Sequence, residues 1–429
     1  MEKKNKKDLL AINGGEKIRN IPYPKHSTMI NHLEEENVLD LLRDGELSGF
    51  SARPGDRFLG GKYVKLLEEK IAKRFDVKHA ITFNSATSAA HAAVSAGGIG
   101  PGDEIITSPF TMSATASSIL MQGAVPVFAD IEDRTYGLDP QSVLEKITNR
   151  TKGILTVNIF GHPSRLDELR AIADSKNILL MEDNAQSPTA NFKGQLAGTV
   201  GEIGILSLNY HKVIQTGEGG VALTNDDDLA LHMQLKRNHG EVVTKKIGQE
   251  NMLNQLGFNY RLPELCAAVG AAQIDKIDIL TKKRVSLAEE LTRKLAVFDF
   301  IETPCKEEHA DHVYYLYPFK FYEEKAGYSR EKFAQALLAE GVSILEGYMQ
   351  PLYLEPIYQS FKAYGNTSFP FEGLNSEMKS DYAKGICPTA EKMFYETLLT
   401  TDICKYPNEI KDIQEFVDAI EKVHSGLSE

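Results

Sequence analysis

Hydrophobic and polar positions alternate with two different periods through the first half of the chain. Between Gly61 and Asn238, short apolar runs rich in β-branched residues take turns with amphipathic stretches. The apolar runs predict strands, and the amphipathic stretches predict helices. This alternation is typical of β-α-β units and predicts a three-layer α/β domain with a mostly parallel, mixed sheet and helices on both faces. The predicted strands are 79–83, 103–108, 125–130, 153–160, 178–183, 203–209 and 219–225, and the helices 85–96, 111–122, 140–147 and 167–176.

The second half of the chain has a different pattern. Residues 262–297 carry apolar side chains at helical spacing and predict a helical connection out of the sheet domain. An apolar run at 312–322 predicts a strand, and a helix is expected after Ser329. A closing helix is expected because one face of it would be formed by Ile410, Ile413, Phe416, Val417 and Ile420.

These patterns divide the chain into three parts. We expect a flexible N-terminal segment (1–20), a large cofactor-binding domain (21–275) and a smaller α+β C-terminal domain (276–429). Residues 364–385 are polar and rich in turn-forming residues, which favours a mobile flap.

Composition and charge narrow the classes of function. The chain has 429 residues, of which 42% are hydrophobic and 25% charged, as expected for a globular protein with a large core. Its formal net charge of -12 argues against nucleic acid or an anionic membrane as a partner. No signal peptide or membrane span is expected. The four cysteines lie far apart, so we expect neither disulfides nor a zinc site, and a reducing cytoplasm fits best.

Two glycine-rich stretches resemble nucleotide-binding loops but lack the required register. Residues 97–104 (GGIGPGDE) follow a predicted helix and miss the G-x-G-x-x-G spacing, so a helix C-cap and turn is favoured. In residues 55–63 (GDRFLGGKY), Tyr63 stands where a P-loop has Ser or Thr to hold magnesium. We therefore do not expect a nucleoside triphosphate to bind at either stretch.

Charged residues follow the ends of two predicted strands. Glu182 and Asp183 end the run at 178–183, and Lys212 follows the run at 203–209, five residues before a Gly-Glu-Gly-Gly turn. Ligands bind beyond the carboxyl ends of parallel strands, so these groups are expected in one crevice, where a buried carboxylate needs a cation. Pyridoxal phosphate requires such a pair: a lysine for the Schiff base and an acid that keeps the pyridine nitrogen protonated.

The phosphate group of this cofactor would need its own hydrogen-bond donors. Residues 84–91 (NSATSAAH) bring small hydroxyl side chains to the start of a predicted helix, whose N-terminal amides attract phosphate. Ser207 adds a hydroxyl from the strand that leads to Lys212.

Each residue also has a simpler structural interpretation when it is considered alone. Asp183 fits a helix N-cap, Lys212 fits a solvated surface lysine, and Thr87 and Ser88 fit the start of a helix. Without a cofactor site, each of these residues needs a separate structural explanation. Their joint occurrence therefore favours a cofactor site over the separate explanations.

Several motifs run through the chain in a specific order. They are N-S-A-T-S-A, G-I-G-P-G-D-E-I-I, F-T-M-S-A-T, V-P-V-F-A-D-I, F-G-H-P, E-D-N-A-Q, S-x(4)-K-x(4)-G-E-G-G, R-N-H-G and G-F-N-Y-R-L. By these motifs nearly the whole chain resembles the DegT/DnrJ/EryC1/StrS family of pyridoxal-phosphate sugar aminotransferases, which have the aspartate aminotransferase fold (fold type I). Any one motif is weak, but their order and spacing together are specific.

The resemblance implies a role for each matching residue. Lys212 would carry the cofactor, Asp183 would pair with the pyridine nitrogen, and Gln186 would lie near the ring hydroxyl. It also implies a homodimer with shared active sites, in which the residues that reach the phosphate are Thr87, Ser88, Ser207 and, from the neighbouring subunit, Asn259.

The chain departs from its relatives at the cofactor face. Where they often have an aromatic residue, this chain has Met112, with Phe110 two residues earlier; a thioether covers a ring with less defined stacking, so we expect reduced cofactor affinity. Dehydratase relatives have histidine in place of the lysine, and His211 directly precedes Lys212. Lys212 lies five residues after Ser207 and five residues before the glycine turn. Because both spacings fit Lys212, we align it, and not His211, with the cofactor-binding lysine of the family.

The resulting hypothesis is a pyridoxal-phosphate-dependent aminotransferase. By resemblance it would move an amino group from an amino acid donor, glutamate, to a nucleotide-linked keto sugar, with pyridoxamine phosphate between the two half-reactions. Its product would serve amino-sugar and surface-polysaccharide biosynthesis. Two alternatives remain: a sugar dehydratase of the same fold and a non-catalytic cofactor-binding regulator. The sequence leaves open the sugar, its ring carbon, whether the sugar is linked to a nucleotide, and which amino acid is the donor.

Overall fold

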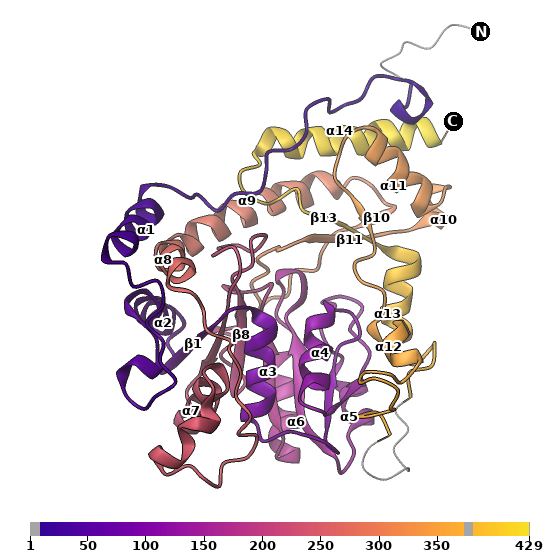
Figure 1. The fold of residues 1–429 in the computed structure, drawn as a ribbon. Coiled ribbons are helices and arrows are strands. Elements are labelled where there is room, and N and C mark those ends of the chain that lie inside the picture. Colours follow the sequence, from indigo (N-terminus) through magenta and orange to yellow (C-terminus); the bar gives the residue numbers. More distant parts are fainter. Residues whose placement is uncertain (1–8, 373–380, 429) are drawn as a thin grey trace, which may run out of the picture.

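A seven-stranded sheet forms the centre of the molecule (Figure 1). The computed structural model describes residues 9–372 and 381–428. The strand order is β1-β9-β8-β5-β4-β2-β3, and only β9 runs against the others. The predicted mostly parallel, mixed sheet is therefore confirmed. Its strands are β1 (His79–Phe83), β2 (Glu104–Thr107), β3 (Val125–Phe128), β4 (Thr151–Val157), β5 (Leu179–Asp183), β8 (Ile203–Ser207) and β9 (Gly220–Thr224).

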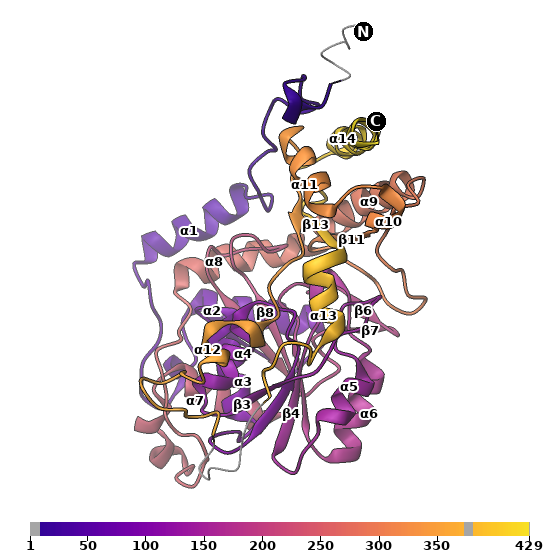
Figure 2. The ribbon, with the colours of Figure 1, turned by 90° about the vertical axis from the view of Figure 1, so that its right-hand side faces the viewer.

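Helices cover both faces of this sheet, because successive strand residues point to opposite sides. On β5, for example, Leu180 packs into the core under one helical layer and Met181 into the core under the other. One layer consists of α3 (Ala86–Ala96), α4 (Ser113–Met121) and α7 (Asp227–Arg237). The opposite layer consists of α5 (Pro140–Lys146), α6 (Leu166–Lys176), α2 (Lys62–Phe75) and α8 (Glu264–Gln273). Figure 2 shows α3 and α6 on opposite sides of the strands.

A second, four-stranded antiparallel sheet lies above the first in Figure 1. Its order is β10 (Ile301–Glu302), β11 (Tyr317–Phe321), β13 (Leu398–Thr401) and β12 (Leu345–Glu346). It shares a core with α9 (Ile277–Leu295), α11 (Arg330–Ala339) and α14 (Ile410–Leu427). The predicted helical connection, the helix after Ser329 and the closing helix are confirmed, but Ile410 is 51% exposed and does not belong to the buried face.

The remaining elements are short or peripheral. The hairpin β6 (Asn191–Phe192) and β7 (Gln195–Leu196) forms a separate two-stranded sheet. The remaining α-helices are α1 (His32–Asp44), α10 (Glu323–Ala326), α12 (Pro356–Gln359) and α13 (Pro388–Lys392). Among the described residues, we find no helix that is both long enough and apolar enough to cross a bilayer.

The N-terminal segment packs against the second sheet's core as far as it is described. Leu10 is 3% exposed in that core, and Arg19 pairs with Asp412 on α14 at 2.8 Å. The first eight residues of the expected flexible segment lie outside the described residues, as do residues 373–380 of the expected flap.

The two glycine-rich stretches have structural roles. Gly97 caps the C-terminus of α3, as predicted. At the start of α2, the Glu264 carboxylate accepts hydrogen bonds from the backbone N–H groups of Gly61, Tyr63 and Val64 at 2.8 to 3.2 Å. The amides that would bind a phosphate in a P-loop already have a carboxylate partner.

Candidate active site

Lys212 lies in the loop between β8 and β9, just beyond the carboxyl end of β8. Its backbone N–H donates to the Asn209 carbonyl at 2.9 Å, and its ammonium nitrogen lies 4.5 Å from the centre of the Tyr315 ring. The His26 ring Nε2 donates to the Lys212 carbonyl oxygen at 3.2 Å. Segments far apart in the sequence therefore hold this lysine, which is not a freely solvated surface residue.

Asp183 ends β5, the strand that pairs with β8, so it lies at the same sheet edge as Lys212. Its carboxylate accepts hydrogen bonds from Thr115 Oγ1 at 2.7 Å and from the Ala185 N–H at 3.1 Å. The next element along the chain is the short strand β6, so Asp183 does not serve as a helix N-cap.

The surroundings of Lys212 change its protonation. The residue is partly exposed, but protein atoms crowd its ammonium group. Desolvation lowers the pKa of Lys212 to about 8; the charge of Asp183 opposes this effect, and the charge of Arg284 adds to it. Partial desolvation and the nearby charge of Lys212 also lower the pKa of His211, an otherwise exposed residue, to about 4, so this imidazole is neutral at pH 7. A neutral lysine amine is thus accessible near physiological pH.

Glu182 has a different role from its neighbour. It is fully buried, and its carboxylate accepts backbone hydrogen bonds from Gly198, Val200 and Gly201 at 2.7 to 2.8 Å. Asn158 adds a side-chain hydrogen bond at 3.1 Å. Glu182 therefore organises the 198–201 loop, and Asp183 is the carboxylate beside Lys212.

The predicted phosphate cradle lies at the start of α3. Ser85, which was not among the predicted phosphate ligands, is the N-cap: its Oγ accepts from the Ser88 N–H at 3.1 Å. Ser88 is buried, and its hydroxyl donates to Asn84 Oδ1 at 2.7 Å, whereas Thr87 is partly exposed. The first amides of α3, those of Ala86 and Thr87, have no intrahelical acceptor.

Gly220 brings the loop after Lys212 against this cradle. It pairs with Ser207 across β8 and β9, and a Cβ added to it would lie only 2.3 Å from Ala86 N. Close approach of the two backbones therefore requires glycine here, while Gly217 adopts a left-handed φ of 82°. As a result, Ser207 lies close to the start of α3, whose first turn contains Thr87 and Ser88.

Gln186 is buried between two aromatic residues. Its Oε1 accepts from the Phe160 N–H at 2.7 Å, and its Nε2 donates to the Tyr348 hydroxyl at 3.0 Å. The Tyr348 contact comes from 162 residues away, so no local pattern predicted it.

Met112 and Phe110 differ strongly in exposure. Met112, at the N-terminus of α4, is 51% exposed, so its thioether is available to a ligand. Phe110 is fully buried, with its ring centre 6.1 Å from that of Phe160 and 6.0 Å from that of Tyr348. Phe110 is therefore a core residue.

Asn259 is exposed in the single chain. Its Oδ1 accepts from Arg261 Nε at 2.8 Å, and the neighbouring Tyr260 carbonyl accepts from the Asn84 N–H at 2.8 Å. The contacts of the described residues do not join the Asn259 side chain to the Lys212 site of the same chain.

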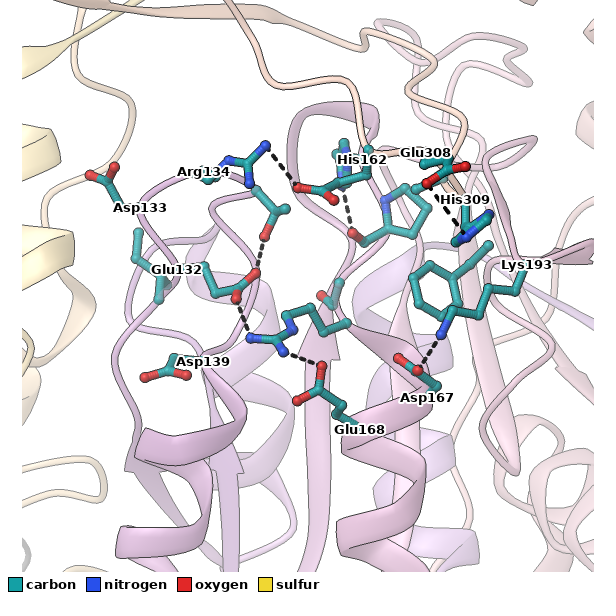
Figure 3. A pocket seen from close by; sticks show the side chains of 18 of the residues that line it. Glu132, Asp133, Arg134, Asp139, His162, Asp167, Glu168, Lys193, Glu308 and His309 are labelled. Atoms are coloured by element: carbon teal, nitrogen blue, oxygen red, sulfur yellow. Dashed lines mark hydrogen bonds and ion pairs between the residues drawn. The ribbon is translucent and has the colours of Figure 1, made fainter.

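A separate cavity of about 770 Å³ lies between residues 131–135, the start of α6 and residues 307–310 (Figure 3). Its charged side chains meet one another: Arg165 binds Glu132 at 2.8 Å, and Lys193 binds Asp167 at 2.5 Å. Of the residues predicted for the cofactor, the described lining of this cavity contains none. It is therefore distinct from the Lys212 site.

The residues at the sheet edge fit a pyridoxal phosphate site. They include a lysine with a lowered pKa, a carboxylate at the end of the adjacent strand, and a helix N-terminus with nearby hydroxyl groups. Together with the three-layer fold, this arrangement defines the class of fold type I pyridoxal-phosphate enzymes.

Comparison with known proteins identifies the family. Residues 51–375 match the DegT/DnrJ/EryC1/StrS aminotransferase family, and the chain belongs to it. It is an aminotransferase of this pyridoxal-phosphate-dependent family.

Curated relatives span most of the chain. A pleiotropic regulatory protein of Geobacillus stearothermophilus is 32% identical, over 86% of this chain and 90% of its own length. GDP-perosamine synthase of Caulobacter vibrioides is 33% identical, over 70% and 79%. L-glutamine:2-deoxy-scyllo-inosose aminotransferase of Streptomyces kanamyceticus is 30% identical, over 96% of each chain. Among solved structures, the aminotransferase from Psychrobacter cryohalolentis has a TM-score of 0.81 at 26% identity, covering 95% of this chain and 100% of its own.

Proposed function

We propose that this chain transfers an amino group from an amino acid to a keto sugar, using pyridoxal phosphate held by Lys212. The observation that carries the proposal is the pair of Lys212 and Asp183 at the ends of adjacent strands, with the lysine pKa lowered to about 8. Bound pyridoxal phosphate supplies an electron sink for negative charge on the donor α carbon.

The chain's own residues would bind the cofactor and move protons. Lys212 would attach it through Nζ and, once released, carry the proton that leaves the donor α carbon. Asp183, oriented by Thr115, would hold a proton on the pyridine nitrogen. The start of α3, with Thr87, Ser88 and Ser207, would bind the phosphate, Gln186 would lie near the ring hydroxyl, and Met112 would cover one ring face.

The substrates in this proposal follow from the chemistry of relatives. One relative's name specifies L-glutamine as donor and an inosose as acceptor, and another makes GDP-perosamine. We assign this chain an amino acid donor, glutamate or glutamine, and a keto sugar acceptor that is nucleotide-linked. Four free cysteines fit a reducing compartment, and we place the activity in the cytoplasm.

A homodimer forms part of the proposal. The segment before Asn259 exposes Leu253 at 65% and Leu256 at 66%, and such apolar side chains favour burial against a partner. Asn259 itself is exposed, so it is available to the phosphate site of a second copy.

A test of the proposal is incubation of the purified, cofactor-loaded protein with glutamate. We expect release of 2-oxoglutarate and conversion of the cofactor spectrum from the aldehyde to the amine form. Lys212→Ala should stay folded, lose turnover and show no borohydride-reducible attachment of the cofactor. Attachment mapped to another lysine, or turnover by the variant, would contradict the assignment.

Two other functions predict different results. A dehydratase would eliminate a sugar hydroxyl without producing 2-oxoglutarate, and a regulator, the description carried by one relative, would bind the cofactor without exchange. The retained lysine favours transamination.

A further inference from the structure

Six cationic side chains are buried in the described part of the chain, and most of them meet a carboxylate. Lys276 binds Glu34 at 2.6 Å, and Lys320 binds Asp133 at 2.6 Å. A buried charge without such a partner is costly. A buried cation that lacks a carboxylate partner therefore calls for an explanation. The six are Lys236, Arg237, Lys276, Arg284, Lys320 and Arg330.

The three buried arginines differ in how well their guanidinium groups are satisfied. Arg237 pairs with Glu68 at 2.6 Å and also donates to backbone carbonyls. Arg330 donates to four backbone carbonyls and lies 3.6 Å from Glu346. Arg284 is 4% exposed but makes one hydrogen bond, from Nη1 to the Tyr315 carbonyl at 3.3 Å, among the described residues.

The free N–H groups of Arg284 reach accessible space. Those of its side-chain nitrogen atoms that lack a hydrogen-bond partner are not fully enclosed by protein atoms. The carboxylate of Asp402, whose charge acts on Arg284, is committed elsewhere, because it binds Lys405 and accepts from the Ser343 hydroxyl at 3.1 Å. The guanidinium therefore keeps donors for a ligand.

Arg284 lies next to the proposed catalytic lysine. The Tyr315 ring is shared by both cations: the Lys212 Nζ is 4.5 Å from its centre, and the Arg284 Cζ is 6.0 Å from it. A ligand whose amino group replaces that of Lys212 on the cofactor could thus bring an anionic group to Arg284. Lys236, the other buried cation that forms no ion pair within the described part of the chain, instead faces the Phe258 ring at 5.4 Å.

We propose that Arg284 binds a carboxylate group of the amino acid donor while the donor's amino group replaces Lys212 Nζ on the carbonyl carbon of the cofactor. This inference rests on the proposed function. A planar guanidinium forms two parallel hydrogen bonds with a carboxylate, which would satisfy the free donors and neutralise the buried charge. The donor is then held at both its amino and its acid group.

The test measures binding of glutarate, a dicarboxylate that lacks an amino group, to the cofactor-loaded protein by calorimetry. Arg284→Gln removes the charge, and Arg284→Lys keeps it without the planar fork. Lys282→Gln is the matched control, because it removes one charge from an exposed position on the same helix. Cofactor absorbance and the thermal midpoint verify that each variant is folded and loaded.

We expect Arg284→Gln to weaken glutarate binding about ten- to a hundred-fold, as for a lost hydrogen bond to a charged group. Arg284→Lys should bind with intermediate affinity, and Lys282→Gln as the wild type does. Glutamate and glutamine then distinguish the two carboxylates of the donor. Loss of apparent affinity for both indicates the α-carboxylate, and loss for glutamate alone indicates the side-chain carboxylate.

Equal glutarate affinity in folded wild-type and Arg284→Gln protein would overturn the inference and leave the proposed function standing. So would a changed Lys212 pKa with unchanged glutarate binding, because Arg284 would then act only through its charge on the lysine. A wild-type protein that neither binds glutarate nor converts glutamate would overturn the proposed function as well.

Discussion

The environment of a single amine decides how the proposed site responds to pH. An ordinary lysine has a pKa of about 10.4, so its neutral form is scarce at pH 7. Desolvation lowers the pKa of Lys212 to about 8, against the opposing charge of Asp183. Only the neutral amine attacks a carbonyl, so the fraction of reactive Lys212 rises as pH increases through about 8.

We therefore predict that cofactor-free protein captures pyridoxal phosphate faster as pH rises from 6, and that the rate levels off above about 8. Stopped-flow absorbance measures the capture rate. The rate measured with Lys212→Ala is subtracted to remove the contribution of other lysines. A rate that keeps rising to about pH 10, as expected for a solvated lysine, would contradict the lowered pKa of Lys212.

A hydroxyl group orients the carboxylate beside this lysine. Thr115 Oγ1 donates to Asp183 Oδ2 at 2.7 Å and lies 3.1 Å from Thr111 Oγ1. We predict that Thr115→Val slows the glutamate half-reaction about tenfold, because a hydrogen bond to a charged group is lost. Thr115→Ser should restore the rate, and Asp183→Asn should slow it far more. A Thr115→Val variant with the wild-type rate would show that Asp183 needs no such support.

At the scale of elements, the close approach of β9 to α3 shapes the proposed phosphate site. A Cβ on Gly220 would lie 2.3 Å from Ala86 N, so a side chain must push the helix start away. We predict that Gly220→Ala lowers the affinity for pyridoxal phosphate at least tenfold by disturbing the α3 amides, an order-of-magnitude expectation for a lost anion contact. Equilibrium dialysis measures this affinity.

Gly100→Ala is the control for this substitution. The nearest atom to a Cβ there is Asn254 Oδ1 at 3.7 Å, an ordinary contact, so binding should be unchanged. Equal affinity in the two variants would mean that the start of α3 does not hold the phosphate.

The elements and the reactive residues differ in how far the sequence could predict them. Strand and helix periods predicted the sheet, because its strands bury both faces, whereas helices such as α2 and α6 bury one face. Lys212 and Asp183 were predictable because they follow apolar strands. Thr115, Tyr315 and Arg284 were not, because they reach the site from distant elements and no local pattern marks them. Ser85 could have been predicted as the N-cap of α3, since a serine directly before a helix is a common N-cap.

At the scale of the whole molecule, the proposed site extends beyond one chain. Asn259 is exposed and follows a segment with exposed Leu253 and Leu256, so a second copy would bury the segment and receive the asparagine. A two-fold axis makes this exchange reciprocal, and each active site would then contain Lys212 from one subunit and Asn259 from the other.

Hybrid dimers test this arrangement. We predict that mixing inactive Lys212→Ala subunits with weakly active Asn259→Ala subunits recovers activity toward about a quarter of the wild-type value per subunit. Random pairing makes half of the dimers hybrid, and each hybrid would carry both substitutions in one site and leave the other site intact. The assay requires that Asn259→Ala alone be clearly impaired and that tagged subunits exchange, as measured by mass spectrometry. Exchange without recovery would restrict Asn259 to its own subunit, because a hybrid would then contain one substitution in each site.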